Sequence, residues 1–75
     1  MRLLTELSLG EHARVAKING SDHISQRLLE MGLTPGVDVS VIGVAPMGDP
    51  IELELRGYRL GVRRSEAARV EVESS

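Results

Sequence analysis

The most regular pattern of apolar and polar positions in the chain runs through residues 51–62. Apolar residues occupy every second position from Ile51 to Leu55, and a second alternating run follows Arg56-Gly57. Alternation with a period of two is typical of a half-buried strand, and two such runs joined by a two-residue turn favour a β-hairpin. Tyr58 lies on the apolar side, so we expect it in the core. The predicted cross-strand pairs are Leu55 with Tyr58, Glu54 with Arg59, and Leu53 with Leu60.

Two earlier segments also have the pattern of strands. Residues 12–18 form a short run that ends at an Asn-Gly-Ser turn. Residues 37–44 are rich in β-branched side chains, which are enriched in strands. Their apolar positions slip by one beside Gly43, and such a slip next to a glycine indicates a bulge or a sharp bend.

Residues 22–31 predict the one helix of the domain. Ser21 or Asp22 is expected to cap its N-terminus by accepting backbone N–H bonds. Its apolar positions recur at helical spacing and line one face, which favours packing against a core. These positions are Ile24, Leu28 and Met31, with Leu29 widening the face.

The C-terminal end of this helix has a signal of its own. Gly32 can supply the left-handed position that follows many helices, and Leu33 would then contact Leu28 in a Schellman ending. Pro35-Gly36 has the composition of a type II turn. The sequence therefore predicts a sharp exit from the helix into the next strand.

One helical turn at residues 65–68 and a last strand over residues 69–73, with Val70 and Val72 inward, complete the predicted elements. The sum is five or six short antiparallel strands with one inserted α-helix. We therefore expect a mainly β fold, a small SH3-like barrel, forming a single domain over residues 1–75.

The composition narrows the functions that such a barrel can serve. The chain has 75 residues with a formal net charge of −2, no Cys, no Phe, no Trp and one Tyr. Without Cys it has no disulfide and no thiolate metal site. Nucleic-acid binding is not expected, because it usually requires excess positive charge and aromatic side chains that stack on bases. A single Tyr also cannot line the aromatic groove with which SH3 domains bind proline-rich peptides.

No segment has the character of a membrane span or a secretion signal. The apolar runs are much shorter than the roughly 20 residues that cross a bilayer. The first residues lack the long apolar stretch of a signal peptide. We therefore expect a cytoplasmic protein.

The sequence contains few of the residue patterns that enzymes use for catalysis. It has no Cys nucleophile, its serines lack a pattern that places a His and a carboxylate nearby, and it has no glycine-rich phosphate-binding loop. We expect no enzyme activity and no cofactor.

His12 and His23 are the only imidazole side chains. They do not have the spacing that places two ligands on one helix face, so a metal site would require both to converge with Asp or Glu. We interpret them as solvent-exposed residues and retain them as weak candidate metal ligands. Direct transition-metal binding or sensing is accordingly the alternative function.

Four arginines gather around the predicted hairpin, namely Arg56, Arg59, Arg63 and Arg64. They could meet an acidic or phosphate-bearing partner. Acidic residues are interleaved at cross-strand distance, namely Glu52, Glu54 and Glu66. We therefore favour a solvated face of paired charges.

Three ordered motifs resemble those of the FeoA family. Residues 27–36 read RLLEMGLTPG, residues 44–50 read VAPMGDP, and residues 60–67 read LGVRRSEA. They are similar to the family's R-L-x-E-M-G-L-x-P-G signature, its A-P-x-G-D-P loop and its L-x-L-R-R-x-E-A end. Residues 7–20 also fit, so the resemblance covers nearly the whole chain. Gly61-Val62 departs from the bulkier apolar pair that is common in the family.

The resemblance implies a small SH3-like protein of bacterial ferrous iron uptake. Its implied partner is the cytosolic region of the membrane Fe(II) transporter FeoB, so it would be peripheral to the membrane through that partner only. The resemblance also implies that such domains occur at the end of iron-dependent repressors; because this chain has no helix-turn-helix for DNA binding, we expect a free-standing form. A homodimer paired through an open strand edge is a further hypothesis.

Our functional hypothesis is a non-enzymatic accessory or regulatory protein that docks on FeoB. The expected docking surface combines the helix and its exit with the loop over residues 45–50. Its residues are Arg27, Met31, Leu33, Thr34, Pro35, Ala45, Pro46, Met47, Gly48, Asp49 and Pro50.

Overall fold

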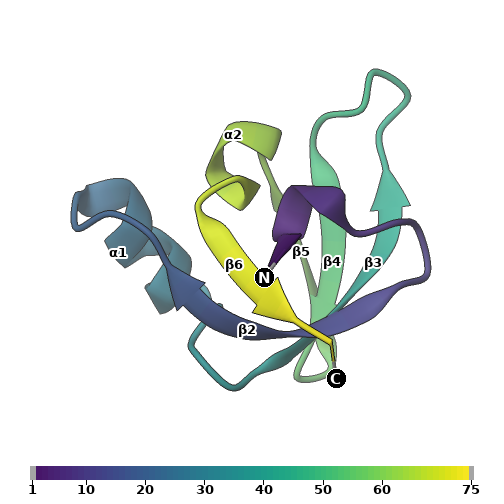
Figure 1. The fold of residues 1–75 in the computed structure, drawn as a ribbon. Coiled ribbons are helices and arrows are strands. Elements are labelled where there is room, and N and C mark those ends of the chain that lie inside the picture. Colours follow the sequence, from purple (N-terminus) through teal and green to yellow (C-terminus); the bar gives the residue numbers. More distant parts are fainter. Residues whose placement is uncertain (1, 75) are drawn as a thin grey trace.

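The computed structural model describes residues 2–74, which form one six-stranded antiparallel sheet with two short α-helices and a 3₁₀ turn, η1 (Figure 1). The elements are β1 (Arg2–Leu3), η1 (Leu4–Glu6), β2 (His12–Ile18), α1 (His23–Glu30), β3 (Asp38–Val44), β4 (Ile51–Leu55), β5 (Tyr58–Val62), α2 (Arg64–Ala67) and β6 (Val70–Glu73). The sheet order is β1-β6-β2-β3-β4-β5. The predicted mainly β fold with an inserted helix is confirmed. Residues 1 and 75 of the predicted domain lie outside the described residues.

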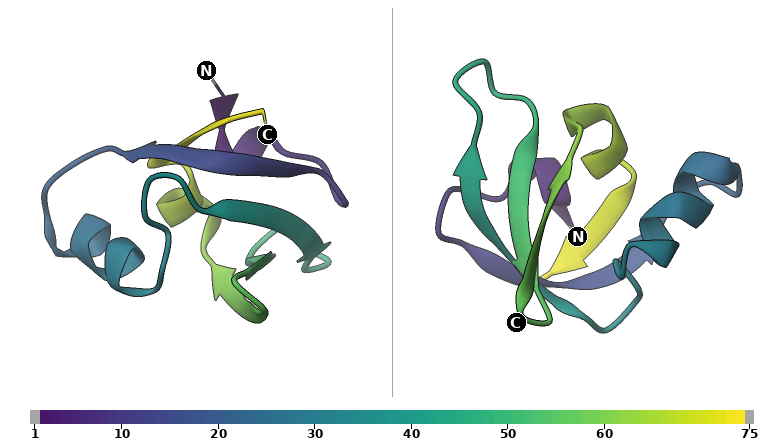
Figure 2. Two further views of the ribbon diagram at one scale, coloured as in Figure 1. Left: turned by 90° about the horizontal axis from the view of Figure 1, so that it is seen from below. Right: turned by 180° about the vertical axis from the view of Figure 1, so that it is seen from behind.

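The sheet curls over and encloses the core between its two halves. Figure 2 shows β2 and β6 on one side, with β3, β4 and β5 on the other. The register shifts between Val15 and Lys17 on β2, and between Val41 and Gly43 on β3. A bulge bends a strand and increases its twist, which lets a sheet close on itself. The shift beside Gly43 matches the slip in the sequence. On β2 the apolar positions also change sides, from Ala13 and Val15 to Ala16 and Ile18, but no glycine accompanies the change.

The core is aliphatic throughout. Its largest fully buried side chains are Leu4, Leu28, Leu33, Leu53, Leu55, Val15, Val39, Val41, Val62, Val70 and Val72. Burying each such side chain contributes about 1.5–3 kcal/mol relative to leaving it in water. Within residues 2–74, every buried side-chain N or O atom has a hydrogen-bond partner. None of the helices in this range is long and apolar enough to cross a membrane.

The β4–β5 hairpin has the predicted register. Leu55 pairs with Tyr58, and the two following pairs along the strands are those expected from the alternation. Arg56 has a φ of 50° and Gly57 a φ of 83°. Positive φ at both central residues is the requirement of a type I′ turn, which matches the twist of the flanking strands.

Tyr58 is not a core residue, contrary to the prediction. Its side chain is 41% exposed, and its hydroxyl donates to the carbonyl of Met31 at the end of α1. The alternation places Tyr58 on the inner side of β5, but that side is not covered at this end of the strand. Tyr58 therefore links the hairpin to the helix instead of filling the barrel.

The α1 helix ends as the sequence predicts. Asp22 caps its first turn through the side chain. At the other end, Gly32 N donates to the carbonyl of Leu29 at 3.0 Å, and Leu33 N donates to the carbonyl of Leu28 at 3.1 Å. These two bonds define a Schellman ending, and both leucines that close it, Leu28 and Leu33, are fully buried.

Gly32 is required at the end of α1 for two separate reasons. Its φ is +108°, a conformation that side chains disfavour, and a Cβ atom at this position would overlap the Tyr58 hydroxyl. The glycine thus permits both the helix ending and the approach of the hairpin.

The predicted type II turn at Pro35-Gly36 joins α1 to the sheet. Val37 N donates to the carbonyl of Thr34 at 3.1 Å, and Gly36 has the positive φ, 95°, that this turn places there. Val15 on β2 then accepts from Gly36 N and donates to the Val37 carbonyl, each at 2.8 Å. The exit of the helix is therefore part of the hydrogen-bonded framework.

The N-terminal residues contribute a strand and a 3₁₀ turn for which the sequence has only a cluster of leucines as a signal. Leu4 in η1 is fully buried. Arg2 Nη1 lies 2.5 Å from a carboxylate oxygen of Glu11. This hydrogen bond, followed by one from the backbone N–H of Ser8, lowers the pKa of Glu11 to about 2.

Candidate partner-binding surface

The β3–β4 loop, residues 45–50, carries the most exposed large apolar side chain among the described residues. Met47 is 92% exposed, and the loop extends away from the barrel in Figure 1. Gly48 N donates to the carbonyl of Ala45 at 2.7 Å, and Ala45 N donates to the carbonyl of Pro50 at 3.1 Å. Gly48 has a φ of +84°, which only glycine adopts without strain. An exposed Met on an ordered turn is suited to docking against another protein.

Arg64, at the start of α2, ties this loop to the barrel. Its Nε donates to the carbonyl of Gly48 at 3.0 Å, and its backbone N donates to Oδ1 of Asp49 at 3.0 Å. Gly48 and Asp49 are both predicted docking residues, and their carbonyl and carboxylate oxygens hold the loop in place. Sequence reasoning assigned no such role to Arg64, because no local pattern reports a contact between segments so far apart in the chain.

The helix side of the predicted surface requires a correction at Leu33. This side chain is fully buried beneath the end of α1, so it is not available to a partner in this fold. Met31 and Thr34 are half-buried, and Pro35 is exposed. Leu29, which the sequence places beside the packed face, is 40% exposed and adds an apolar position to the outside of α1.

The two parts of the predicted surface do not meet. Figures 1 and 2 place α1 on one side of the barrel and the β3–β4 loop on the other. The longest extent of the molecule is 30 Å. A partner that contacts both parts would therefore have to reach across the domain.

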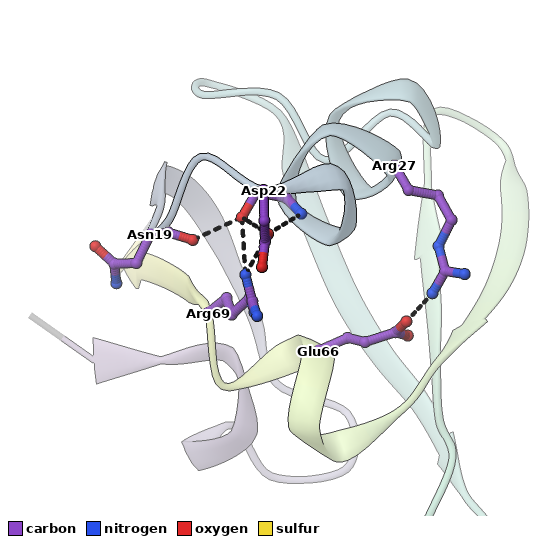
Figure 3. A network of polar contacts seen from close by, with 6 residues as sticks. Asn19, Asp22, Arg27, Glu66 and Arg69 are labelled. Carbon is purple, nitrogen blue, oxygen red and sulfur yellow. Dashed lines mark hydrogen bonds and ion pairs between the residues drawn. The ribbon is translucent and has the colours of Figure 1, made fainter.

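A polar network fastens the start of α1 to the segment before β6 (Figure 3). Oδ1 of Asp22 accepts from Arg69 Nη1 at 2.6 Å and from the backbone N of Ser25 at 3.2 Å. Ser25 Oγ donates to the carbonyl of Asn19 at 2.8 Å. The bond from Arg69, then that from Ser25, lowers the pKa of Asp22 to about 2. Asp22 thus acts both as a helix cap and as a tether.

Arg27, a predicted docking residue, is engaged inside the fold. It forms an ion pair with Glu66 of α2 (Figure 3). The Arg27 side chain is 57% exposed, whereas that of Glu66 is 13% exposed. Glu66 also accepts from the backbone N of Arg63 at 3.1 Å. A partner that recruited Arg27 would have to compete with this pair.

The two histidines lie on different elements. His12 begins β2, and His23 begins α1, which follows the end of that strand. Both are exposed. A strand of seven residues spans roughly 20 Å. Within residues 2–74, no group of three His, Cys, Asp or Glu side chains is placed to hold a metal ion.

The arginines near the hairpin do more than form the solvated, paired face that we favoured. Glu66 pairs with Arg27 of α1. Arg56 donates to Oγ1 of Thr34 at 3.3 Å, and Arg64 holds the β3–β4 loop. Arg59 lies opposite Glu54 in the predicted register. At least two of these arginines therefore connect neighbouring segments of the fold.

Comparison with known proteins identifies the same domain over almost the whole chain. The family model of the FeoA domain matches residues 2–74. The Fe(2+) transport protein A/Fe(2+) transporter FeoB fusion protein of Porphyromonas gingivalis is 36% identical over 70 residues, which make up 93% of this chain and 8% of that protein. This chain therefore spans a small part of the length of that curated relative.

Two solved structures have the same fold. The FeoA-like protein of Clostridium acetobutylicum is 38% identical, with a TM-score of 0.90 over 96% of this chain and 84% of that one. The FeoA of Stenotrophomonas maltophilia, crystallised in complex with zinc and described as a prokaryotic SH3 domain protein, is 32% identical, with a TM-score of 0.84 over 97% of this chain and 91% of that one. These structures confirm the SH3-like fold, and with the family match they show that this chain belongs to the FeoA family.

Proposed function

We propose that this chain is a non-enzymatic accessory protein of bacterial ferrous iron uptake that docks on the cytosolic region of FeoB. The observation that carries the proposal is the Porphyromonas gingivalis relative, in which a region similar to this chain and FeoB belong to one polypeptide. Joining two modules in one chain raises their effective concentration and favours contact between them. In the proposal, this chain makes the corresponding contact in the cytoplasm and reaches the membrane through FeoB.

The docking surface in this proposal centres on the β3–β4 loop. Met47 offers a flexible apolar side chain that is 92% exposed on a loop closed by its own backbone hydrogen bonds. Burying one such side chain against a partner is favourable by about 1.5–3 kcal/mol relative to leaving it in water, before the entropic cost of association. The remaining exposed residues of the loop, Pro46, Asp49 and Pro50, form the rim of the contact.

The outer side of α1 and its exit form a second contact area in the proposal. It includes Arg27, Met31, Thr34 and Pro35. Each is at least partly exposed, although Arg27 is engaged with Glu66. Because this area and the loop lie on different sides of the barrel, the two contacts can be tested separately.

Capture of the FeoB cytosolic region by immobilised protein tests the proposal. Met47→Asp places a charge at the centre of the contact and should remove most of the binding. Leu9→Asp changes another exposed apolar residue, 68% exposed, outside the loop and should bind like the unaltered protein. Undiminished binding by Met47→Asp would reject the loop as the docking surface, and no binding by the unaltered protein would reject FeoB as the partner.

Direct transition-metal binding is the second candidate, and one observation favours it: the Stenotrophomonas maltophilia relative was crystallised in complex with zinc. In this chain His12 and His23, with nearby carboxylates, are the residues to test. Isothermal titration with Zn²⁺ or Fe²⁺ should then show heat that disappears in the His12→Ala/His23→Ala double variant. Equal heats from both proteins would remove the two histidines from the proposal.

Self-association is a separate proposal, because β1 and β5 are the terminal strands of the sheet and an unpaired strand edge can accept another strand. Light scattering over a range of protein concentrations tests it. A mass that stays at that of one chain at every concentration would reject the homodimer.

A further inference from the structure

The residues around α2 contact three other parts of the fold. Arg64 bonds to the β3–β4 loop. Glu66 pairs with Arg27 in the middle of α1. Arg69 bonds to Asp22 at the start of α1. The segment over residues 63–69, which includes α2, therefore contacts both the β3–β4 loop and α1, the two areas of the proposed docking surface.

The contact at the β3–β4 loop is the one that bears on docking. Met47 is 92% exposed, so its side chain contributes little to holding the loop against the barrel. The backbone bonds of Ala45, to Gly48 and to Pro50, both lie within the loop and close it on itself. Arg64, by contrast, reaches the loop from another element through both its side chain and its backbone N–H.

We infer that Arg64 is a positioning residue, which fixes the β3–β4 loop in the conformation that presents Met47 to the partner. The inference rests on the proposed docking role of the loop and deepens it. The Arg64 guanidinium provides a charged donor at Nε for the carbonyl of Gly48, the residue that follows Met47. A hydrogen bond with an ionised donor is stronger than one between neutral groups. The bond therefore restrains the backbone directly beside the exposed side chain.

Restraint of the loop favours binding because less freedom is lost when the complex forms. A flexible loop must be ordered on association, whereas one already held in its bound conformation avoids most of that cost. An ordered tip that projects a single Met also fits an apolar recess better than a flat surface. The partner chemistry that this geometry favours is thus a shallow apolar pocket on the cytosolic region of the transporter.

A pair of neighbouring variants tests the positioning role without any partner. Arg64→Gln removes the charged donor, whereas Arg63→Gln makes the same change of charge at the adjacent residue, whose backbone bonds to Glu66 and Ala67 do not reach the loop. NMR relaxation of the Met47 methyl group and of the backbone amides of Met47 and Gly48 should show increased motion in Arg64→Gln only. Unchanged relaxation in Arg64→Gln would overturn the inference even if the loop binds FeoB.

Binding measurements on a double-mutant cycle test the link to Met47. Arg64→Gln should weaken binding to the FeoB cytosolic region by about three- to tenfold at an unchanged thermal midpoint. In a Met47→Ala background the same change should have little effect, because the restrained side chain is already gone. Equal effects of Arg64→Gln in both backgrounds would overturn the inference.

The outcomes also separate this inference from the proposed function. If Met47→Ala binds like the unaltered protein, the loop is not the docking surface, and the relaxation data alone decide whether Arg64 orders it. If Met47→Ala binds weakly and Arg64→Gln binds normally, the loop docks but Arg64 does not position it. Arg64→Met retains an unbranched side chain without the donor and replaces Arg64→Gln if that variant fails to fold.

Discussion

The β3–β4 loop and the exit of α1 both carry FeoA-like motifs, yet the fold uses them in opposite ways. The loop leaves Met47 92% exposed, whereas the helix exit buries Leu33 completely. Gly32 lies in the same motif as Leu33. Only glycine fits this position, because its φ is positive and a Cβ atom would overlap the Tyr58 hydroxyl. A residue can therefore belong to a family motif because it closes the fold rather than because it touches a partner, and only burial separates the two cases.

The strongest test of this difference is Leu33→Ala. Removal of a fully buried leucine side chain should lower the free energy of unfolding by about 2–5 kcal/mol, because transfer energy is lost and a cavity remains. Leu9→Ala, at a position that is 68% exposed, should change it by less than about 0.5 kcal/mol. Urea unfolding measures both. If Leu33→Ala unfolded like the unaltered protein and yet lost FeoB binding, the assignment of Leu33 to the core would be wrong.

Gly32→Ala should have the next largest effect. The left-handed conformation costs an L-residue about 1–2 kcal/mol, and the added Cβ must also displace the Tyr58 hydroxyl. Gly61→Ala is the matched control, because its φ is not in the left-handed region and a Cβ there has no neighbour within 4 Å. Thermal unfolding should show a clear loss for Gly32→Ala alone. Similar midpoints for the two variants would contradict the role given to Gly32.

Arg27→Ala should have a smaller effect, because exposed ion pairs contribute about 0.2–1 kcal/mol. The Glu66 side chain is mostly covered, so removing its partner should lower the free energy of unfolding more than Arg14→Ala does. Arg14→Ala removes a pair at 3.8 Å whose acid, Asp38, is far more exposed. Urea unfolding at low and high salt measures both differences. A larger effect from Arg14→Ala would indicate that the Arg27 pair does not fasten α1.

The effect expected at Asp22 depends on pH: it is present near neutral pH and disappears in acid. The folded pKa of about 2 lies below the ordinary value of 3.8. The ionised carboxylate therefore stabilises the folded state above pH 4, and this contribution is lost as the pH falls toward 2. Asp22→Asn retains a capping side chain and should make stability less dependent on pH in this window. Unfolding curves between pH 5 and pH 2 measure the change.

Glu11→Gln gives the matching measurement at the other end of the fold. Its pKa falls from 4.5 to about 2 through Arg2 and Ser8, so the same sign applies over a slightly wider pH range. If neither variant altered the acid dependence, the ion pairs at both sites would be absent in solution.

Local patterns were sufficient for the hairpin and for the ending of α1. The register of β4 and β5 follows from alternation and a two-residue turn, and both are properties of adjacent residues. The Schellman ending likewise depends on Gly32 and the leucines within one helical turn. These features were predictable because the interactions that stabilise them join residues close in sequence.

The contacts around α2 were not predictable in this way. Arg64, Glu66 and Arg69 bond to groups 15, 39 and 47 positions away in the chain. No periodicity links such positions. A run of charged residues like that over residues 63–69 would also be expected on a face that contacts only solvent. Tyr58 shows the same limit, since alternation indicates its side of the strand but not whether another element covers that side.

The sequence by itself determined the family, the aliphatic barrel of short strands and the absence of thiol chemistry, because motif order, alternation and composition are properties of the chain alone. Only the tertiary structure decided which motif residues are exposed. It buried Leu33, left Met47 outside, placed α1 and the β3–β4 loop on different sides of the barrel, and connected both to α2. The physical reason is that burial and long-range hydrogen bonds depend on which segments pack together, and the curled sheet determines that packing.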